Sequence, residues 1–541
     1  MEVGAPPPAP RPGVRPDDGS DGGGTFRWGI QEPAAIVPPA VSDPHGVAVV
    51  DALFDSLTAW DPPAGGEGGG ADAAGGQGSA LVGAAAVHWG ADASATTWTF
   101  QLRPGATFHD GSAVTAQDFK FAWEVAVGLD ETGPGYQLRH VEGYEAVRSG
   151  QARQLAGVAA LDDRTLQVRL SRPFADFPAV VAHPALGPVP GGVWTVDPAA
   201  FRNRPIGNGP FRAAEAWAHG RFIRLARYEG WRNGPRPRTA IDEVLFQIID
   251  PDTAFVAFQQ GRLDFTVLPP GALEEATARY GVSRDGYRGP GVLLGDEPVM
   301  YYLAFNVTRQ PFDDPQVRRA LSVAIDRSAV ARDSLDGNLE VARSAVPPAI
   351  PGARPGTCQA CNHSPAAARQ VLAERGVRAV TLWFNRGGGH EAIAERVRRD
   401  LAEVGVAVSF RSVDFPRFLA ALRSGEADLF RFGWTADHPT LDEALYPLFH
   451  SDGWANFGGY GDPEVDALLD QARATLDEVQ RRQLYQRAED LALGRDQAIA
   501  PLVTFRHRAV VSDRVVGFTY GPMGTANLAQ LEVREPDAAS T

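Results

Sequence analysis

Alternating apolar and polar positions mark the strands of this chain, and apolar stripes with a period near 3.6 mark its helices. Residues 98–103 alternate strictly and predict a half-buried strand, and residues 165–170 predict another. Between them, Thr115 and Asp118 have the spacing of an N-terminal capping box, and the apolar positions that follow predict a helix through Val127. The pattern therefore predicts a mixed α/β unit in this part of the chain.

Two further helical stripes begin at Asp-Pro pairs, which supply a cap and a first-turn proline. After Asp314-Pro315, apolar residues recur at i, i+3, i+4, i+7 and i+8 from Val317, which predicts one buried helical face. The same kind of stripe follows Asp462-Pro463, where the apolar positions are Val465, Leu468, Leu469 and Ala472.

A βαβ unit is predicted between these two helices. It consists of a strand at 380–384, a turn at the glycines 387–389, a helix with apolar positions from Ile393 to Val404, and a strand at 406–410. Glycines before a helix can cradle an anion. They lack dinucleotide-binding spacing, however, so a plain connection is the favoured interpretation.

Residues 428–439 read Asp-Leu-Phe-Arg-Phe-Gly-Trp-Thr-Ala-Asp-His-Pro. The apolar run predicts a strand that breaks at Gly433 into a polar segment. Trp434 offers an aromatic wall, Asp437 a lone carboxylate and Arg431 a cation, which are the groups that an amphipathic ligand requires. The alternative is an ordinary strand-to-loop corner with a packed Trp and a solvated Asp.

Composition excludes several classes of protein. The length of 541 residues suggests roughly three or four domain-sized units, and 44% hydrophobic with 22% charged residues is typical of a soluble globular protein. The net charge of −15 argues against nucleic acid or an anionic membrane as the main partner. Residues 1–24 are rich in Pro, Gly and Asp and predict a flexible tether, and residues 62–78 predict a mobile surface loop.

The start of the chain lacks the charged-then-apolar pattern of a secretory leader, and no apolar run is long enough to span a bilayer. Either the protein is cytosolic or the sequence starts downstream of a removed export segment, and composition does not separate these two possibilities.

Motifs for catalysis and for metal binding are absent from the sequence. There is no G-x-S-x-G, H-E-x-x-H, phosphate-binding loop or EF-hand pattern. The histidines lack partners at metal-ligand spacing, including His88, His109, His183, His390 and His438. We therefore expect no enzymatic activity, no cofactor and no metal site.

The two cysteines, Cys358 and Cys361, form a lone C-x-x-C that is compatible with redox activity, half of a zinc site or a local disulfide. His363 would be the only further zinc ligand nearby, and the motif lies in a Pro/Gly-rich loop, 347–365, instead of opening a helix after a strand. A local disulfide formed in an oxidising compartment is the favoured interpretation.

Four blocks in order along the chain resemble the peptide/nickel-type family 5 of bacterial solute-binding proteins, the extracytoplasmic receptors of ABC importers. Residues 97–124 are similar to the family signature, residues 206–211 to its glycine-rich corner, and residues 302–327 and 456–469 to two further family blocks. The resemblance continues in order over roughly residues 25–535, and several ordered matches are far more specific than any one short motif.

The resemblance implies an α/β fold of two lobes, the type II-like fold of periplasmic binding proteins with an inserted subdomain. It implies that lobe I is discontinuous, that residues 58–183 form the inserted subdomain II, and that residues 265–506 form lobe III. The parts of lobe I are then residues 25–57, 184–264 and 507–536. The crossings between lobes, where a hinge is expected, fall at residues 265–270 and 500–506.

The resemblance also implies a function. The expected protein is a monomeric extracytoplasmic receptor that captures short peptides by hinge closure and delivers them to an ABC permease, anchored as a lipoprotein through residues 1–24. Alternatives on the same fold are a binder of another solute, such as an oligosaccharide or an amine-bearing metabolite, and a non-transporting regulator. Nickel binding, which one branch of the family shows, has no support in the residues.

Site residues follow by position in the resemblance. Asp437 would receive the α-ammonium of the peptide, Trp434 and Thr435 would frame its backbone, Gly433 would allow close approach, and Arg431 would pair with a carboxylate.

Three further residues are carried over as ligand-binding candidates. They are Glu32, Tyr136 and Asn456, the last of which opens the fourth block. The region of Glu32 departs from the family pattern, because Val37-Pro38 stands where Asp-Pro is usual.

Overall fold

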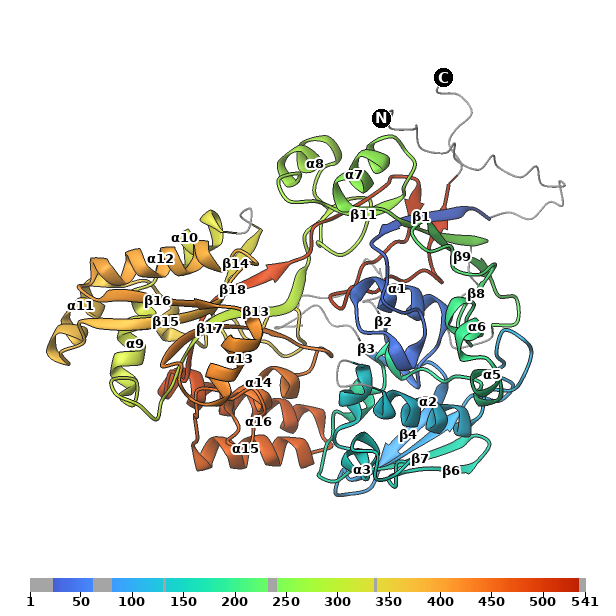
Figure 1. Ribbon diagram of the computed structural model, residues 1–541, viewed down its shortest axis with the longest axis horizontal. Coiled ribbons are helices and arrows are strands. Elements are labelled where there is room, and N and C mark those ends of the chain that lie inside the picture. Colours follow the sequence, from blue (N-terminus) through green and yellow to red (C-terminus); the bar gives the residue numbers. More distant parts are fainter. Residues whose placement is uncertain (1–22, 62–79, 130–132, 232–240, 335–337, 535–541) are drawn as a thin grey trace.

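The computed structural model of the protein describes residues 23–61, 80–129, 133–231, 241–334 and 338–534. Two lobes lie side by side, each built on its own large sheet (Figure 1). The expected loop at 62–78 and nearly all of the expected tether at 1–24 lie outside the described residues.

Lobe I is built on a seven-stranded sheet with the order β12-β19-β11-β1-β10-β9-β8. The central strand β1 pairs in parallel with β10 along its whole length. In the order of the sheet the strands are β12 (Gly291–Leu293), β19 (Ala509–Val511), β11 (Phe265–Val267), β1 (Thr25–Ile30), β10 (Glu243–Ile248), β9 (Phe222–Arg227) and β8 (Phe211–Ala213). The helices of this lobe are α1 (Pro44–Leu53), α5 (Gly191–Val196), α6 (Pro198–Asn203), α7 (Pro251–Gln259) and α8 (Leu273–Tyr280).

Subdomain II is built on a four-stranded antiparallel sheet, β4-β5-β7-β6. The predicted strand and capping box are confirmed, because β5 covers Thr97–Leu102 and Thr115 and Asp118 exchange capping bonds at the start of α2 (Ala116–Gly128). The other elements are β4 (Ala86–Ala91), β6 (Val158–Asp162), β7 (Thr165–Arg169), α3 (Tyr144–Arg148) and α4 (Phe177–Val180). Two-stranded ribbons β2 (Thr58–Asp61) with β3 (Ala80–Gly83) and β20 (Val515–Val516) with β21 (Glu532–Val533) complete this half.

Lobe III is built on a six-stranded sheet with the order β14-β18-β13-β17-β15-β16. The predicted βαβ unit is confirmed, since β15 and β16 pair in parallel on either side of α12 in the chain. The strands are β14 (Leu339–Val341), β18 (Ile499–Arg506), β13 (Asp296–Phe305), β17 (Leu429–Thr435), β15 (Ala379–Asn385) and β16 (Ala407–Val413). The helices are α9 (Pro315–Val323), α10 (Arg327–Asp333), α11 (Pro365–Glu374), α12 (His390–Glu403), α13 (Phe415–Arg423), α14 (Leu441–Phe449), α15 (Pro463–Ala474) and α16 (Glu478–Glu489).

The predicted break of the strand at Gly433 is wrong. Strand β17 continues to Thr435, because it pairs with β13 at every position from Phe305 opposite Leu429 to Val299 opposite Thr435. A complete ladder of backbone hydrogen bonds outweighs the low strand preference of one glycine.

The apolar cores show which parts of the chain are packed into one body. Lobe I and subdomain II share one continuous core, which includes Phe26 of β1 and Phe100 of β5. Lobe III has separate cores on the two faces of its sheet, with Tyr302 of β13 in one and its neighbour Leu303 in the other. Lobe III is therefore a distinct body, whereas subdomain II is packed onto lobe I.

The chain passes between the two large sheets in two short connections. One joins Leu293 at the end of β12 to Asp296 at the start of β13, and the other joins Arg506 at the end of β18 to Ala509 at the start of β19. Both connections lie C-terminal to the crossings expected from the sequence. The reason is that the strands before each connection stay paired within the sheet of their own lobe further along the chain than expected.

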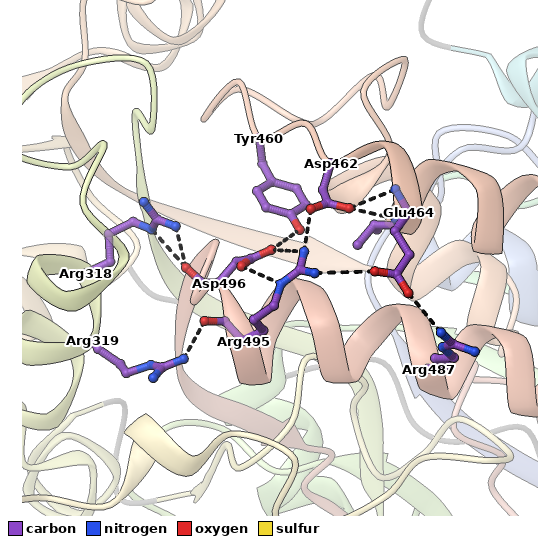
Figure 2. Close-up of polar contacts among 9 residues, drawn as sticks. Arg318, Arg319, Tyr460, Asp462, Glu464, Arg487, Arg495 and Asp496 are labelled. Atoms are coloured by element: carbon purple, nitrogen blue, oxygen red, sulfur yellow. Dashed lines mark hydrogen bonds and ion pairs between the residues drawn. The ribbon is translucent and has the colours of Figure 1, made fainter.

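A charged network fixes the far end of lobe III (Figure 2). Arg495 is paired with Asp462, Glu464 and Asp496. In the same network, Arg318 and Arg319 of α9 donate to backbone carbonyls of residues 494–497. These contacts tie α9 and the start of α15 to the π-helical turn Asp490–Arg495 that follows α16, and they give the helices on this face a fixed position.

Candidate functional site

A cleft with a cavity volume of about 120 Å³, partly open to solvent, lies between the two lobes. Most of its wall comes from lobe I and from the residues around α4, including Trp60, His183 and Asn527. Lobe III contributes the loop after β17, with Asp437 and His438. The predicted carboxylate therefore lies in the wall of this cleft.

Asp437 is hydrogen bonded to Tyr136 of subdomain II. The Tyr136 hydroxyl of the 3₁₀ helix Pro134–Leu138 donates to Asp437 Oδ2 at 2.6 Å, which is within the range of about 2.5–2.7 Å for a hydroxyl on a charged carboxylate. Within the described chain, Oδ1 of Asp437 accepts no hydrogen bond, so it remains available to a ligand donor. The structure thus joins two of the predicted site residues that are far apart in sequence.

A second contact between the lobes lies beside the first. Arg139 Nη2 of subdomain II is 3.6 Å from Glu443 Oε2 of α14, and Glu443 is also 3.3 Å from His438 Nε2. Glu443 and His438 are almost completely buried, at 1% and 3% exposed. Neither carboxylate oxygen of Glu443 accepts a hydrogen bond from the part of the chain described here, so this charge is held by ion pairing alone.

Burial raises the pKa of Asp437 above its ordinary value, the neighbouring Glu443 carboxylate raises it further, and the hydrogen bond from Tyr136 acts in the opposite direction. For His438, burial is the largest influence and lowers the pKa, but Glu443 and Asp437 together outweigh it and the net pKa is raised. The charge of Asp437 therefore depends on the charges of the neighbouring Glu443 and His438.

Three predicted residues at the end of β17 differ in their surroundings. Trp434 is 4% exposed, and its indole N–H donates to the Glu443 carbonyl at 2.8 Å, so it supports the start of α14. Thr435 is exposed. A Cβ on Gly433 would meet no described atom closer than the Met300 carbonyl at 3.8 Å. The protein itself therefore does not require a glycine at position 433.

Arg431 lies one third of the way along β17 and is 8% exposed. Its guanidinium lies over the rings of Tyr301 and Phe418 at 5.7 and 5.5 Å, and its Nε has no hydrogen-bond partner among the described residues. Burial lowers the pKa of Arg431, and burial together with the charge of Arg431 lowers the pKa of the neighbouring His390 to about 4. A buried cation with an unsatisfied N–H can accept an anionic ligand group.

Glu32 and Asn456 are not part of the group of residues around Asp437. Glu32 is paired with His219 at 2.8 Å and accepts from the Gly220 N–H at 2.9 Å on the surface of lobe I. Asn456 binds the backbone of His450 and Tyr460 and orders the loop between them.

Sequence reasoning missed Glu443, His438 and Arg139 as members of the site. His438 is adjacent to Asp437 but had no partner at a recognisable spacing, and Arg139 and Glu443 are separated by hundreds of residues. No sequence signal identifies them, since only the approach of subdomain II to α14 makes them neighbours.

Cys358 and Cys361 form a disulfide next to the buried core of lobe III. Among the described residues, no cluster of His, Cys, Asp or Glu has the arrangement of a metal site. The same part of the chain contains no helix of the length and apolarity needed to cross a membrane.

Comparison with known proteins identifies relatives of similar size. A family model described as bacterial extracellular solute-binding proteins, family 5 Middle, matches residues 80–456. The glutathione-binding protein GsiB of Escherichia coli K12 is 27% identical over 447 residues, covering 79% of this chain and 81% of the relative. The dipeptide-binding protein DppE of Bacillus subtilis 168 is 27% identical over 469 residues and covers 82% of each chain.

The fold has solved counterparts. The unliganded open form of the periplasmic murein tripeptide-binding protein MppA superimposes with a TM-score of 0.81 at 23% identity, covering 94% of this chain and 97% of that one. HbpA2 from Haemophilus parasuis gives a TM-score of 0.79 at 20% identity, covering 95% and 100%. The predicted two-lobed α/β fold is thereby confirmed.

Proposed function

The chain belongs to family 5 of the bacterial extracellular solute-binding proteins, and from this premise we propose that it is the receptor of an ABC importer for short peptides. It captures a peptide in the cleft between its lobes and delivers it to a membrane permease. It works outside the cytoplasm as a monomer, held to the membrane by its N-terminal segment as a lipoprotein. Binding, and not catalysis, is its activity.

The observation that carries this proposal is the carboxylate of Asp437 in the wall of the cleft, with Tyr136 bonded to one oxygen and the other oxygen available. A cleft that closes over a peptide removes water from the α-ammonium, and a buried charge must then be compensated by an opposite charge. Asp437 supplies that charge. The Tyr136 hydroxyl orients the carboxylate from the opposite lobe.

Two features of β17 support peptide backbone binding. The open space beside Gly433 leaves room for a ligand main chain to lie against the strand, and main-chain hydrogen bonds of that kind give affinity without fixing side chains. Arg431, whose Nε has no protein partner in the described chain, then pairs with a carboxylate of peptides long enough to reach it.

Closure is proposed to occur about the two connections Leu293–Asp296 and Arg506–Ala509. The separate cores of lobe III, beside the shared core of lobe I and subdomain II, favour movement of two bodies about these connections. A ligand that touches both bodies shifts the equilibrium toward the closed form, which then docks on the permease. The division into lobe I, subdomain II at residues 58–183 and lobe III is part of this proposal, with lobe III starting at β13 instead of at residue 265, because β11 and β12 belong to the sheet of lobe I.

Relatives whose names state glutathione, dipeptide or murein tripeptide binding make short peptides the first class of ligand to test. The test is thermal unfolding in the presence of a library of di- to pentapeptides, with oligosaccharides and free amines as parallel sets. A bound ligand raises the unfolding temperature by mass action. Peptides that raise it support the proposal. A rise with sugars or amines and none with peptides overturns it.

A further inference from the structure

The two lobes also meet through residues 174–176 of subdomain II and the helices α15 and α16 of lobe III. At this contact the Ala175 N–H of subdomain II donates to the Arg473 carbonyl of α15 at 2.7 Å, and the Arg473 guanidinium lies 5.2 Å over the Phe174 ring. Beside it, Arg481 Nε of α16 is 3.0 Å from Asp176 Oδ1. In Figure 1, α15 and α16 approach subdomain II in the lower part of the view, below the strands β11 and β18 that flank the connections between lobes.

The ion pair between Asp176 and Arg481 is largely removed from water, since the two side chains are 11% and 15% exposed. Arg481 also donates to the carbonyls of Thr475 and Leu476, which hold its guanidinium at the end of α15. The basic group is thus positioned by lobe III alone, ready for the carboxylate that subdomain II brings to it.

The surroundings of Asp176 make this partner necessary. The other charged or titratable groups that face Asp176 are Asp442 of α14, His438, Arg473 of α15 and Tyr485 of α16. Arg473 is already engaged with both oxygens of Asp442, at 2.7 and 2.8 Å. Burial raises the pKa of Asp176 to about 6, with Arg481 acting against the rise. Without Arg481, an ionised Asp176 would face the Asp442 carboxylate across a desolvated contact.

We propose that Asp176 and Arg481 form a charge-compensating latch: in the ligand-free protein the approach of the two lobes buries the Asp176 carboxylate, and Arg481 supplies the cation that this burial requires. They are positioning residues: they do not touch the peptide, but they set the fraction of the protein in the closed arrangement, and apparent affinity scales with that fraction. This inference rests on the proposed hinge movement and is independent of which ligand is bound.

The test measures the distance between lobes in the ligand-free protein. The native cysteines are bonded to each other, so cysteines introduced at the exposed Leu161 of β6 and Phe415 of α13 accept spin labels selectively. Pulsed electron resonance at pH 7.5 then reports the populations of short and long distances. We expect Arg481→Gln to raise the ratio of open to closed molecules about tenfold or more, because it leaves a buried carboxylate unpaired.

Two further measurements distinguish the loss of the latch from a general loss of structure in Arg481→Gln. Protonated Asp176 needs no cation, so lowering the pH to 5 is expected to restore the short distances in Arg481→Gln. For the same reason, the double variant Asp176→Asn/Arg481→Gln is expected to restore them at pH 7.5. Arg481→Lys keeps a cation and is expected to stay closed. Arg487→Gln is the matched control, because Arg487 lies on the same helix but is paired with Glu464 of its own lobe.

The latch is overturned if Arg481→Gln has the distances of the parent protein, or if its opening persists both at pH 5 and in the double variant. These results are independent of the peptide screen. Failure of all peptides to bind would refute the proposed ligand and leave the latch standing, whereas unchanged distances beside intact peptide binding would refute the latch alone.

Discussion

Tyr136 of subdomain II donates a 2.6 Å hydrogen bond to Asp437 of lobe III, 301 positions away in the sequence. The residue expected to receive the ligand therefore already holds a donor from the opposite lobe. A ligand ammonium at Oδ1 would add a second contact to the Asp437 carboxylate. The ammonium, the carboxylate and the Tyr136 hydroxyl would then draw the lobes together.

Asp437→Asn is expected to weaken the binding of short peptides by about 3–5 kcal/mol, because the buried ammonium loses the charge that compensates it. Isothermal titration calorimetry measures the change, and acetylation of the peptide N-terminus should produce a comparable loss in the unaltered protein. Asp428→Asn is the control, since Asp428 is paired with Arg309 on the surface of lobe III. Equal affinity in Asp437→Asn and the parent protein would remove Asp437 from the site.

Tyr136→Phe is expected to cost about 1.5–3 kcal/mol of peptide binding, the usual contribution of a hydrogen bond to a charged group. The loss should appear as faster peptide dissociation in stopped-flow fluorescence, because the bond links the two lobes at the proposed ligand site. Tyr144→Phe, in the same subdomain and away from Asp437, should bind peptides normally. Tighter binding in Tyr136→Phe would mean that the hydroxyl competes with the ligand.

Peptide affinity is expected to fall as the pH is lowered, at a higher pH than for an ordinary aspartate. Burial and Glu443 raise the pKa of Asp437, so its carboxyl becomes neutral earlier during acidification and no longer attracts an ammonium. Affinity is full above this pKa and is lost as the pH falls through it. Calorimetry from pH 8 to pH 4 measures the profile.

The same profile tests the coupling to Glu443. Glu443→Gln removes one cause of the raised pKa and should move the loss of affinity to lower pH. A profile that stays in place would show that Glu443 does not influence the charge of Asp437.

Gly433→Ala is expected to leave stability unchanged within about 1 kcal/mol, because a Cβ at this position has space and the backbone is ordinary strand. Peptide binding should nevertheless weaken, since the methyl group occupies the space proposed for the ligand main chain. Chemical denaturation and calorimetry on the same sample measure the two effects. Unaltered affinity would place the peptide away from this part of β17.

Reduction of the Cys358–Cys361 disulfide is expected to destabilise lobe III only modestly, by about 2 kcal/mol, because the closed loop is very short and restricts the unfolded chain little. Urea denaturation with and without reductant measures this difference, and Cys358→Ser/Cys361→Ser should reproduce it. Complete unfolding of the protein on reduction would contradict this prediction.

Local pattern accounts for much of what could be predicted. The alternation in β5, the capping box of α2, the Asp-Pro starts of α9 and α15 and the βαβ unit of lobe III all depend on neighbours within a few residues. Those interactions are local, so a single sequence contains them. The extent of β17 was mispredicted, because its last residues are held by a ladder to β13, which is distant in sequence.

Sequence by itself determined the elements, the family resemblance and the choice of Asp437 and Tyr136 as separate candidates. Only the tertiary structure decided that these two residues touch, that Glu443 and His438 pair beside them, and that Glu32 and Asn456 are engaged elsewhere. It also brought Asp176 to Arg481. The physical reason is that desolvation and charge pairing act through distance in space, which the packing of subdomain II against lobe III sets and no local pattern of residues records.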